Sequence, residues 1–234
     1  MPILSSLIPS RGLVCLLVAL LLTGCSGTGS PGPTDGRRAT GGATAAERSG
    51  APDATRSFAV VGDSITSGTA APLRDPDVDA PDSWVPGALG EPLTFVGGWA
   101  TPGATTKDMR DAVGAQAAGV LVLMAGTNDL GASVPWSDSE DNLEAIVDTV
   151  GISDVVVSAV PPLDPMPEQA LEYNRRLAEL ADREGWTYVD PWVQASRNGS
   201  FTAGASEDGI HPVPAVAEQA GERLRWVLLE GLDG

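Results

Sequence analysis

Short apolar runs alternate along the chain with segments that repeat apolar residues at helical spacing. The apolar runs lie at 57–61, 93–96, 120–124, 154–160 and 187–189. Runs of this length, rich in Val and Leu and closed by Gly, Pro or Asp, predict buried β-strands. The segments with helical spacing lie at 105–118, 139–150, 167–184 and 214–229. We therefore expect strands and helices that alternate over most of the chain.

This alternation predicts an α/β fold. Continuously apolar strands joined through helices form βαβ units, whose parallel sheet is covered on both faces. Right-handed crossovers then give a three-layer α/β/α sandwich around a five-stranded, mostly parallel sheet, formed by residues 57–234. In such a sheet the ligand crevice lies beyond the carboxyl ends of the strands, so the residues after each strand are the first candidates for a site.

The N-terminus has a different pattern. Residues 13–22 form an apolar run preceded by a single basic residue, Arg11. A bilayer span needs about 20 apolar residues, so this shorter run indicates a secretory signal peptide. The sequence LTGC that ends at Cys25 resembles a bacterial lipobox, which implies cleavage after residue 24 and lipidation of Cys25. The alternative is an ordinary signal peptide in which this cysteine is incidental.

The segment 25–56 has the composition of a linker, with Gly, Ser, Thr, Pro and Ala and almost no large apolar side chain. Such a segment cannot bury enough apolar surface to offset the entropy lost on ordering, so we expect a flexible tether. The expected organisation is a lipoprotein signal peptide over 1–24, the lipidated Cys25 and tether over 25–56, and one folded domain over 57–234. This organisation places the protein outside the cytoplasm, anchored to the bacterial cell membrane through its lipid.

Composition excludes several classes of site. The 234 residues hold 14 Lys and Arg against 31 Asp and Glu, a net charge of −17, so nucleic acid is not an expected partner. One histidine cannot supply a metal site that needs two imidazoles. Two cysteines make neither a four-cysteine zinc site nor a disulfide-rich scaffold. We expect no metal and no cofactor.

Three segments carry polar residues suited to acyl transfer. GDSIT, around Ser64, follows the first predicted strand, and GTND, around Asn128, follows the third. DGIH, from Asp208 to His211, comes just before the last predicted helix. Acyl transfer needs a nucleophile, a base that takes its proton, an acid that orients the base, and donors for the oxyanion. The three segments supply a residue of a suitable type for each role.

Together and in this order, the segments resemble the SGNH (GDSL) hydrolase family, and the resemblance covers nearly all of 57–234. It implies a flavodoxin-like α/β/α fold with Ser64 as nucleophile, His211 as base and Asp208 as the acid of a Ser-His-Asp triad. It also implies that two groups donate to the oxyanion, namely the side-chain amide of Asn128 and the backbone N–H of Ser64.

A glycine N–H from the loop after the second strand completes the oxyanion hole of that family. Gly103 is the candidate here, with Gly97 and Gly98 as alternatives, because Gly98-Trp-Ala stands where family members often show Asn-x-Gly. Asp63 and Asp129, which neighbour Ser64 and Asn128, are expected to brace their loops rather than to act as the triad acid.

Each segment also has a purely structural explanation. Gly-Asp-Ser is common in turns and helix caps. Asn128 could be a turn residue in a left-handed conformation, and Asp-x-x-His could begin a helix. The ordered occurrence of all three segments makes this explanation the weaker one.

The sequence thus predicts a serine esterase that hydrolyses carboxylic esters, either acyl esters or O-acetylated carbohydrate, through an acyl-enzyme. The same residues would serve a lysophospholipase, a thioesterase or an acyltransferase. A binding module that kept the fold without activity is the remaining alternative. We expect a monomer whose partners are its ester substrate and the membrane, with substrate choice set by the loops at 67–92 and 131–138.

Overall fold

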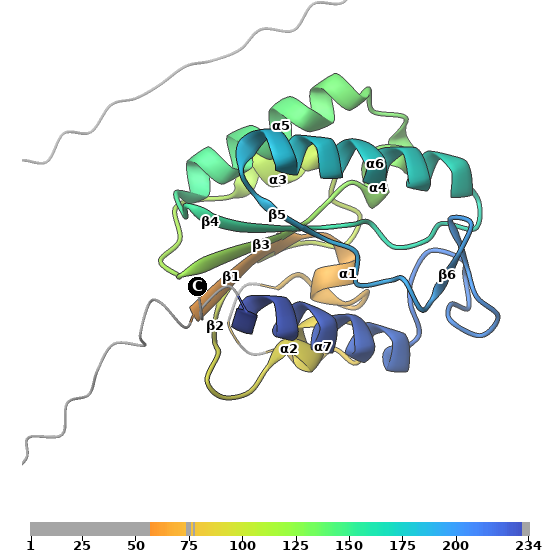
Figure 1. Ribbon diagram of the computed structural model, residues 1–234, viewed down its shortest axis with the longest axis horizontal. Helices are drawn as coiled ribbons and strands as arrows, with labels where there is room; N and C mark the ends of the chain where they lie inside the picture. Colours follow the sequence, from red (N-terminus) through yellow and green to blue (C-terminus); the bar gives the residue numbers. More distant parts are fainter. Residues whose placement is uncertain (1–56, 74–75, 77, 231–234) are drawn as a thin grey trace, which may run out of the picture. The chain divides into compact units, whose positions relative to one another are not determined.

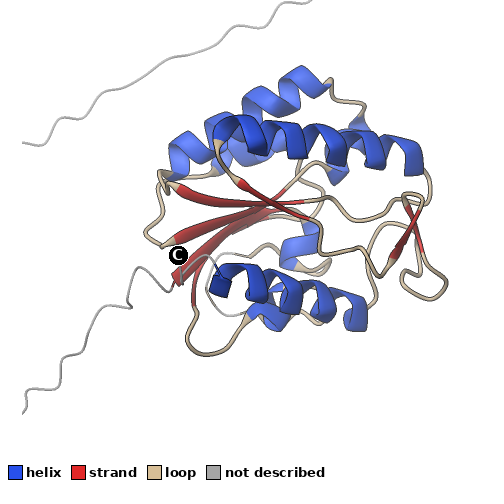
Figure 2. Ribbon diagram, in the orientation of Figure 1, coloured by secondary structure: helices blue, strands red, loops and turns tan. Residues whose placement is uncertain are grey.

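The centre of the molecule is a sheet of five parallel strands. The computed structural model describes residues 57–73, 76 and 78–230; the predicted signal peptide, Cys25 and the tether lie outside them. The strands are β1 (Ser57–Gly62), β2 (Thr94–Ala100), β3 (Val120–Met124), β4 (Asp154–Ser158) and β5 (Thr187–Val189). They lie in the order β2-β1-β3-β4-β5, and every neighbouring pair is parallel (Figures 1 and 2). The predicted fold class is confirmed.

Helices cover both faces of this sheet (Figure 1). One face is covered by α1 (Ser64–Ser67), α2 (Val85–Ala88) and α7 (Pro214–Glu230). The other is covered by α3 (Thr106–Ala112), α4 (Thr127–Ala132), α5 (Trp136–Val150) and α6 (Pro167–Glu184). The protein therefore has three layers, helices on sheet on helices.

Alternation along β1 shows how the sheet divides the core. Phe58 and Val60 pack with apolar residues of α2 and α7. Ala59 and Val61 point to the opposite face and pack with α3, α5 and α6. All four side chains are buried, as expected for a central strand whose successive residues face opposite sides of a covered sheet.

The observed bounds differ from the predicted ones mainly at element ends. α6 spans the predicted range, whereas α5 begins three residues earlier than predicted. The predicted helix over 105–118 is too long, because α3 ends at Ala112 and the backbone is already extended at Val113. Gly114 follows directly, and glycine is a poor helix former.

The second strand was expected to close at Gly97 and Gly98, and this prediction is wrong. β2 continues through both glycines to Ala100. Gly98 lies opposite Val60 of β1 with φ +150°, and a Cβ atom there would lie only 2.0 Å from the Val60 carbonyl oxygen. The glycine therefore lets the two strands approach, at the point where their register shifts.

The structure adds short elements that the apolar pattern does not predict. These are α1, α2, α4 and a hairpin of β6 (Ser196–Arg197) and β7 (Ser200–Phe201). Elements of two to six residues are too short to show a period in the sequence. Within the described ranges, no helix has the length and apolarity needed to cross a membrane.

Candidate active site

Ser64 begins α1 directly after the carboxyl end of β1. Asp63 caps this short helix, because its Oδ1 accepts the Ile65 N–H at 2.9 Å and its carbonyl oxygen accepts the N–H groups of Thr66 and Ser67. The N–H of Ser64 itself donates to no residue in the described part of the chain. The first N–H groups of a helix have no partner within it, so that of Ser64 remains available to a ligand.

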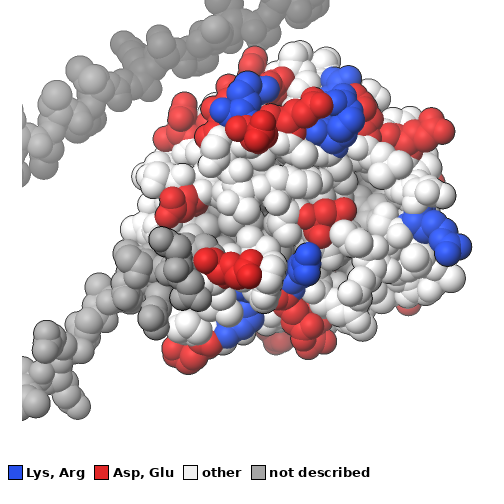
Figure 3. Space-filling view, viewed as in Figure 1, with Lys and Arg blue, Asp and Glu red and all other residues white. Residues whose placement is uncertain are grey.

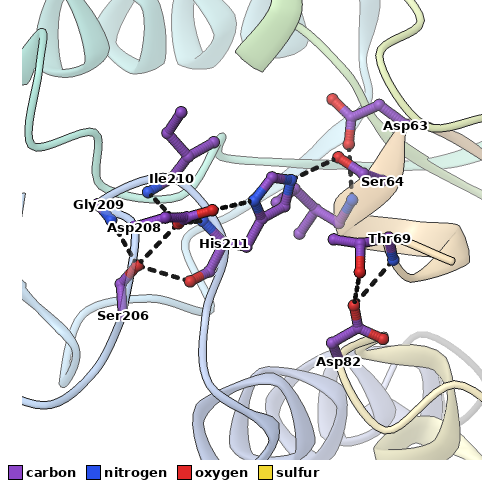
Figure 4. Close-up of polar contacts among 10 residues, drawn as sticks. Asp63, Ser64, Thr69, Asp82, Ser206, Asp208, Gly209, Ile210 and His211 are labelled. Carbon is purple, nitrogen blue, oxygen red and sulfur yellow. Dashed lines mark hydrogen bonds and ion pairs between the residues drawn. The ribbon is translucent and has the colours of Figure 1, made fainter.

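His211 joins Ser64 to Asp208 (Figure 4). Its Nε2 lies 3.0 Å from Ser64 Oγ, and its Nδ1 lies 2.7 Å from Asp208 Oδ2. With the proton on Nδ1, the imidazole donates to Asp208, and Nε2 accepts the hydroxyl proton of Ser64. The structure thus brings the three predicted residues together, although 147 positions separate Ser64 from His211.

Backbone hydrogen bonds fix Asp208 against His211. Asp208 Oδ1 accepts the N–H groups of Ile210 at 2.9 Å and His211 at 2.8 Å (Figure 4). Partial burial opposes ionisation of Asp208, but these bonds and the one from the imidazole outweigh it and hold its pKa well below its usual range. The carboxylate is therefore charged at neutral pH and can orient and stabilise the imidazolium.

Ser206 is a site residue that the sequence analysis missed. Its hydroxyl donates to the His211 carbonyl oxygen at 2.6 Å and accepts the Gly209 N–H at 2.9 Å (Figure 4). It closes the turn that carries Asp208 and His211. The available signal was a serine two residues before an aspartate and three before a glycine, which is typical of side-chain-to-backbone turns.

Asn128 lies in the first turn of α4, beyond the end of β3. Its Nδ2 donates to the Ala104 carbonyl oxygen at 3.0 Å and lies 3.3 Å from Asp63 Oδ2. The carboxamide is thus held between the loop after β2 and the residue before Ser64. The N–H that faces Asp63 makes the longer bond, so it is the one that an oxyanion beside Ser64 would attract.

The loop after β2 places Gly103 at the same end of the sheet. The Thr101 N–H donates to the last carbonyl of β1 at 3.3 Å, and the Ala104 N–H returns to Thr101 at 3.1 Å. Gly103 occupies this turn at φ +78°, a conformation that favours glycine, and its N–H donates to no described residue. Gly97 and Gly98 lie inside β2 instead, before the strand ends.

Asp63 and Asp129 lie where bracing residues are expected. Asp63 is buried and contacts Asn128 and its own helix, and burial raises its pKa to about 7. Asp129 is fully buried and accepts the Thr106 N–H at 2.8 Å, the Thr106 hydroxyl at 2.6 Å and the Ser139 hydroxyl at 2.5 Å. It therefore ties α4 to α3 and α5, on either side of Asn128 and the Gly103 turn.

A further carboxylate, Asp82, lies beside α1 in the loop region expected to set specificity. Its Oδ2 accepts the N–H of Thr69 at 2.8 Å and the Thr69 hydroxyl at 2.6 Å (Figure 4). Partial burial opposes ionisation, but these two bonds lower the pKa of Asp82, so it adds negative charge on the α1 side of His211. Among the described residues, no group of three or more His, Cys, Asp or Glu is placed to hold a metal ion.

Solved structures resemble this one in fold at low sequence identity. A GDSL-like lipase from Bacteroides thetaiotaomicron superposes with a TM-score of 0.58 and 15% identity, over 76% of this chain and 89% of that one. The family 3 carbohydrate esterase of Clostridium thermocellum gives 0.53 and 15%, over 76% and 96% of the two chains. A family 3 carbohydrate esterase from Talaromyces cellulolyticus gives 0.52 and 14%, over 76% and 98%.

Sequence comparison is specific at the level of the family. No curated protein matches the chain by sequence. The family model described as GDSL-like lipase/acylhydrolase matches residues 60–218, which include β1 with Ser64, β3 with Asn128, and the Asp208–His211 turn. This match covers more than half of the chain, and the fold agrees with it. The protein therefore belongs to the GDSL-like lipase/acylhydrolase family.

Proposed function

We propose that this protein is a serine esterase that cleaves carboxylic esters through an acyl-enzyme. The observation that carries the proposal is the continuous hydrogen-bonded chain from Ser64 through His211 to Asp208. A serine hydroxyl is a weak nucleophile until a base in hydrogen-bond contact removes its proton. The 3.0 Å separation of Ser64 Oγ and His211 Nε2 allows that transfer.

The reaction would run in two halves. As Ser64 Oγ attacks the ester carbonyl, its proton passes to His211 Nε2, and Asp208 stabilises the imidazolium. The proton then goes to the departing alcohol, the C–O bond breaks, and the acyl group stays on Ser64. In the second half, His211 takes a proton from water, the resulting attack releases the acid, and Ser64 recovers its proton.

The oxyanion that forms in each half needs donors in fixed positions. The Ser64 N–H, the Gly103 N–H and the Asn128 amide are proposed for this role, because all three lie at the carboxyl ends of adjacent strands. The Ser64 and Gly103 N–H groups donate to no described residue, and the Asn128 carboxamide is anchored by Ala104. Donors held in this way need no reorganisation during the reaction.

For the substrate we propose an acyl ester or an O-acetyl group on carbohydrate. The likeness to two family 3 carbohydrate esterases supports the second class, and the likeness to a GDSL-like lipase supports the first. A lysophospholipase, thioesterase or acyltransferase would use the same residues. Release of nitrophenol from short and long acyl esters separates these classes by acyl length, and an added acceptor alcohol detects transfer.

We further propose that the enzyme acts as a monomer outside the cytoplasm, held at the membrane through lipid on Cys25. The apolar run at 13–22 and the LTGC sequence support this location. Residues 25–56 would act as a tether between the lipid and the catalytic domain.

A fluorophosphonate probe tests the enzymatic function directly. The folded protein is expected to be labelled on Ser64 and to hydrolyse p-nitrophenyl acetate with a burst, whereas Ser64→Ala is expected to lose both properties. Ser137→Ala removes an exposed hydroxyl at the start of α5 and serves as the matched control. Folded wild-type protein that takes up no probe would instead be the non-catalytic binding module.

A further inference from the structure

Two hollows lie along the outer edge of the sheet, beside β5. One, of about 420 Å³, is formed by the chain after β5 and the outer side of α7. The other, of about 270 Å³, lies between α6, β5 and the β6–β7 hairpin. Asp190, the residue that follows β5, lines both, so the two hollows adjoin at this side chain. Ser64, His211 and Asn128 line neither.

Exposed apolar side chains concentrate at these hollows. Four large hydrophobic residues of the described part are exposed, and three of them are Leu171, Val193 and Trp226. Leu171 lines the smaller hollow, while Val193 and the half-exposed Trp226 line the larger one. In Figure 3 the face that carries β5 is mostly uncharged, whereas Arg and acidic residues crowd the rim above it, over α5 and α6. Apolar side chains gathered in one place indicate a surface that meets a ligand.

Asp190 supplies an unusual polar group at the junction. Its Oδ1 accepts the Trp192 N–H at 2.9 Å, and no other described residue hydrogen-bonds to the carboxylate. Burial raises its pKa, although the Trp192 N–H and the charge of Arg223 act in the opposite direction. No described Lys or Arg lies within ion-pair distance of it. A partly buried carboxylate with spare acceptor capacity is stabilised by a ligand that brings hydroxyl donors.

Arg223 faces this carboxylate from α7. Its guanidinium lies 5.3 Å from the centre of the Trp226 ring, so it is held against the indole. The larger hollow therefore combines an exposed indole with a guanidinium, two carboxylates (Asp190 and Glu222) and two carboxamides. This set offers many hydrogen-bond donors and acceptors around one apolar platform, which suits a ring with hydroxyl groups on its edge and C–H groups on its face. The two carboxylates disfavour an anionic ligand.

An added β-strand is a poorer fit to this edge. β5 has only three residues, so it offers few backbone groups to a pairing strand from another chain. Recognition through side chains in the two hollows is the better match.

We infer that the hollows along β5 form a saccharide-binding surface, separate from the Ser64 site, that takes a neutral sugar chain with one ring on Trp226 and its hydroxyls on Asp190. The surface would hold the enzyme on a polysaccharide while the catalytic site acts nearby. The inference does not depend on the proposed esterase activity, since binding needs none of the triad residues.

Calorimetric titration of the full-length Ser64→Ala protein tests this inference without turnover. The probes are three neutral oligosaccharides, xylotetraose, cellotetraose and chitotetraose, with tri-galacturonic acid as the anionic comparator. At least one neutral probe is expected to bind, and tri-galacturonic acid is expected to bind more weakly. Trp226→Ala and Asp190→Asn should each weaken the binding by about tenfold or more. Leu89→Ala removes the fourth exposed hydrophobic residue, which lines neither hollow, and should leave the affinity unchanged.

Two outcomes overturn the inference. One is that no neutral probe binds at millimolar concentration, or that binding is the same in Trp226→Ala. The other is that the protein is a dimer in solution which Trp226→Ala converts to monomer, because the surface would then belong to a second copy of the chain. Neither outcome changes the fluorophosphonate labelling of wild-type protein, so failure here is distinct from failure of the esterase proposal.

Discussion

Asp63 and Asp208 show how one residue type takes two opposite electrostatic states in the same site. Asp208 accepts three hydrogen bonds that favour its charged form, and its pKa is lowered. Asp63 is buried under the nucleophile with fewer such bonds, and burial raises its pKa to about 7. Only Asp208 therefore supplies a permanent negative charge to His211, which is what the proposed mechanism asks of it.

The raised pKa of Asp63 predicts a specific pH dependence of stability. In the unfolded chain this carboxyl titrates near ~3.9, below its folded value, so between these values the unfolded state releases the proton first. The free energy of unfolding should therefore fall, by a few kcal/mol at most, as the pH rises from about 4 to about 7, and then level off. Urea unfolding of wild type and Asp63→Asn across this range measures the effect.

The comparison with the variant isolates Asp63 from the other carboxyl groups. Asparagine resembles the protonated acid, so Asp63→Asn should gain stability relative to wild type between pH 5 and pH 8. Asp111→Asn is the control, since Asp111 is exposed, its pKa is lowered and it does not titrate in this window. Parallel curves for wild type and Asp63→Asn would show that Asp63 is ionised throughout.

Asn128 is expected to matter for kcat rather than for KM. Removing one oxyanion donor costs roughly 2.7–4 kcal/mol in comparable sites, so Asn128→Ala should lower kcat about a hundredfold or more on p-nitrophenyl acetate. KM should change little, because the donor acts mainly on the transition state. Gln116→Ala, a neutral truncation in the loop before β3, should keep wild-type kcat. Equal activity of Asn128→Ala and wild type would remove Asn128 from the oxyanion hole.

At the scale of elements, periodicity located what is long and the structure supplied what is short. The five strands and the helix over 167–184 follow from apolar runs and spacing, because each buries a face of sufficient length. α1 and α4 have four and six residues, too few for a period, yet they carry Ser64 and Asn128. These residues were identified through the order of three motifs, whereas Ser206 acts through a turn that carries no such signal.

β2 illustrates the other limit of the sequence. A glycine pair ordinarily indicates the end of a strand, but the close approach of β1 to β2 depends on a contact between residues far apart in the chain. The same pairing brings the Gly103 turn beside Ser64 through the bond from Thr101 to the end of β1. The candidate site therefore depends on strand packing that no local pattern encodes.

Gly98→Ala is expected to be strongly destabilising for this reason. Its Cβ would lie 2.0 Å from the Val60 carbonyl oxygen, in a backbone conformation at φ +150° that side chains rarely adopt. The strands must separate, so we expect a loss of several kcal/mol in the free energy of unfolding. Gly114→Ala meets no atom within 4 Å and should change stability by less than about 0.5 kcal/mol. Thermal unfolding of the two variants decides the point, and similar melting temperatures would contradict it.

At the scale of the whole molecule, charge bears on how the protein meets a membrane. The chain carries a net charge of −17, and residues 1–56 hold more basic than acidic side chains, so the acidity belongs to the folded domain. An acidic domain is repelled by anionic lipid headgroups and has no electrostatic means of binding them. Attachment through the domain surface is therefore disfavoured, and any stable membrane association must come from the N-terminus.

Cys25→Ser is accordingly expected to move the protein from the membrane pellet to the soluble extracytoplasmic fraction. Each buried CH₂ of an acyl chain contributes about 0.8 kcal/mol, so several chains on one cysteine hold a protein firmly, and high salt should not release the wild type. Cys15→Ser is the matched control, because Cys15 lies within the predicted signal peptide and its removal should leave fractionation unchanged. Wild-type protein that high salt washes off, or Cys25→Ser that stays in the pellet, would show that the domain binds the membrane through contacts of its own.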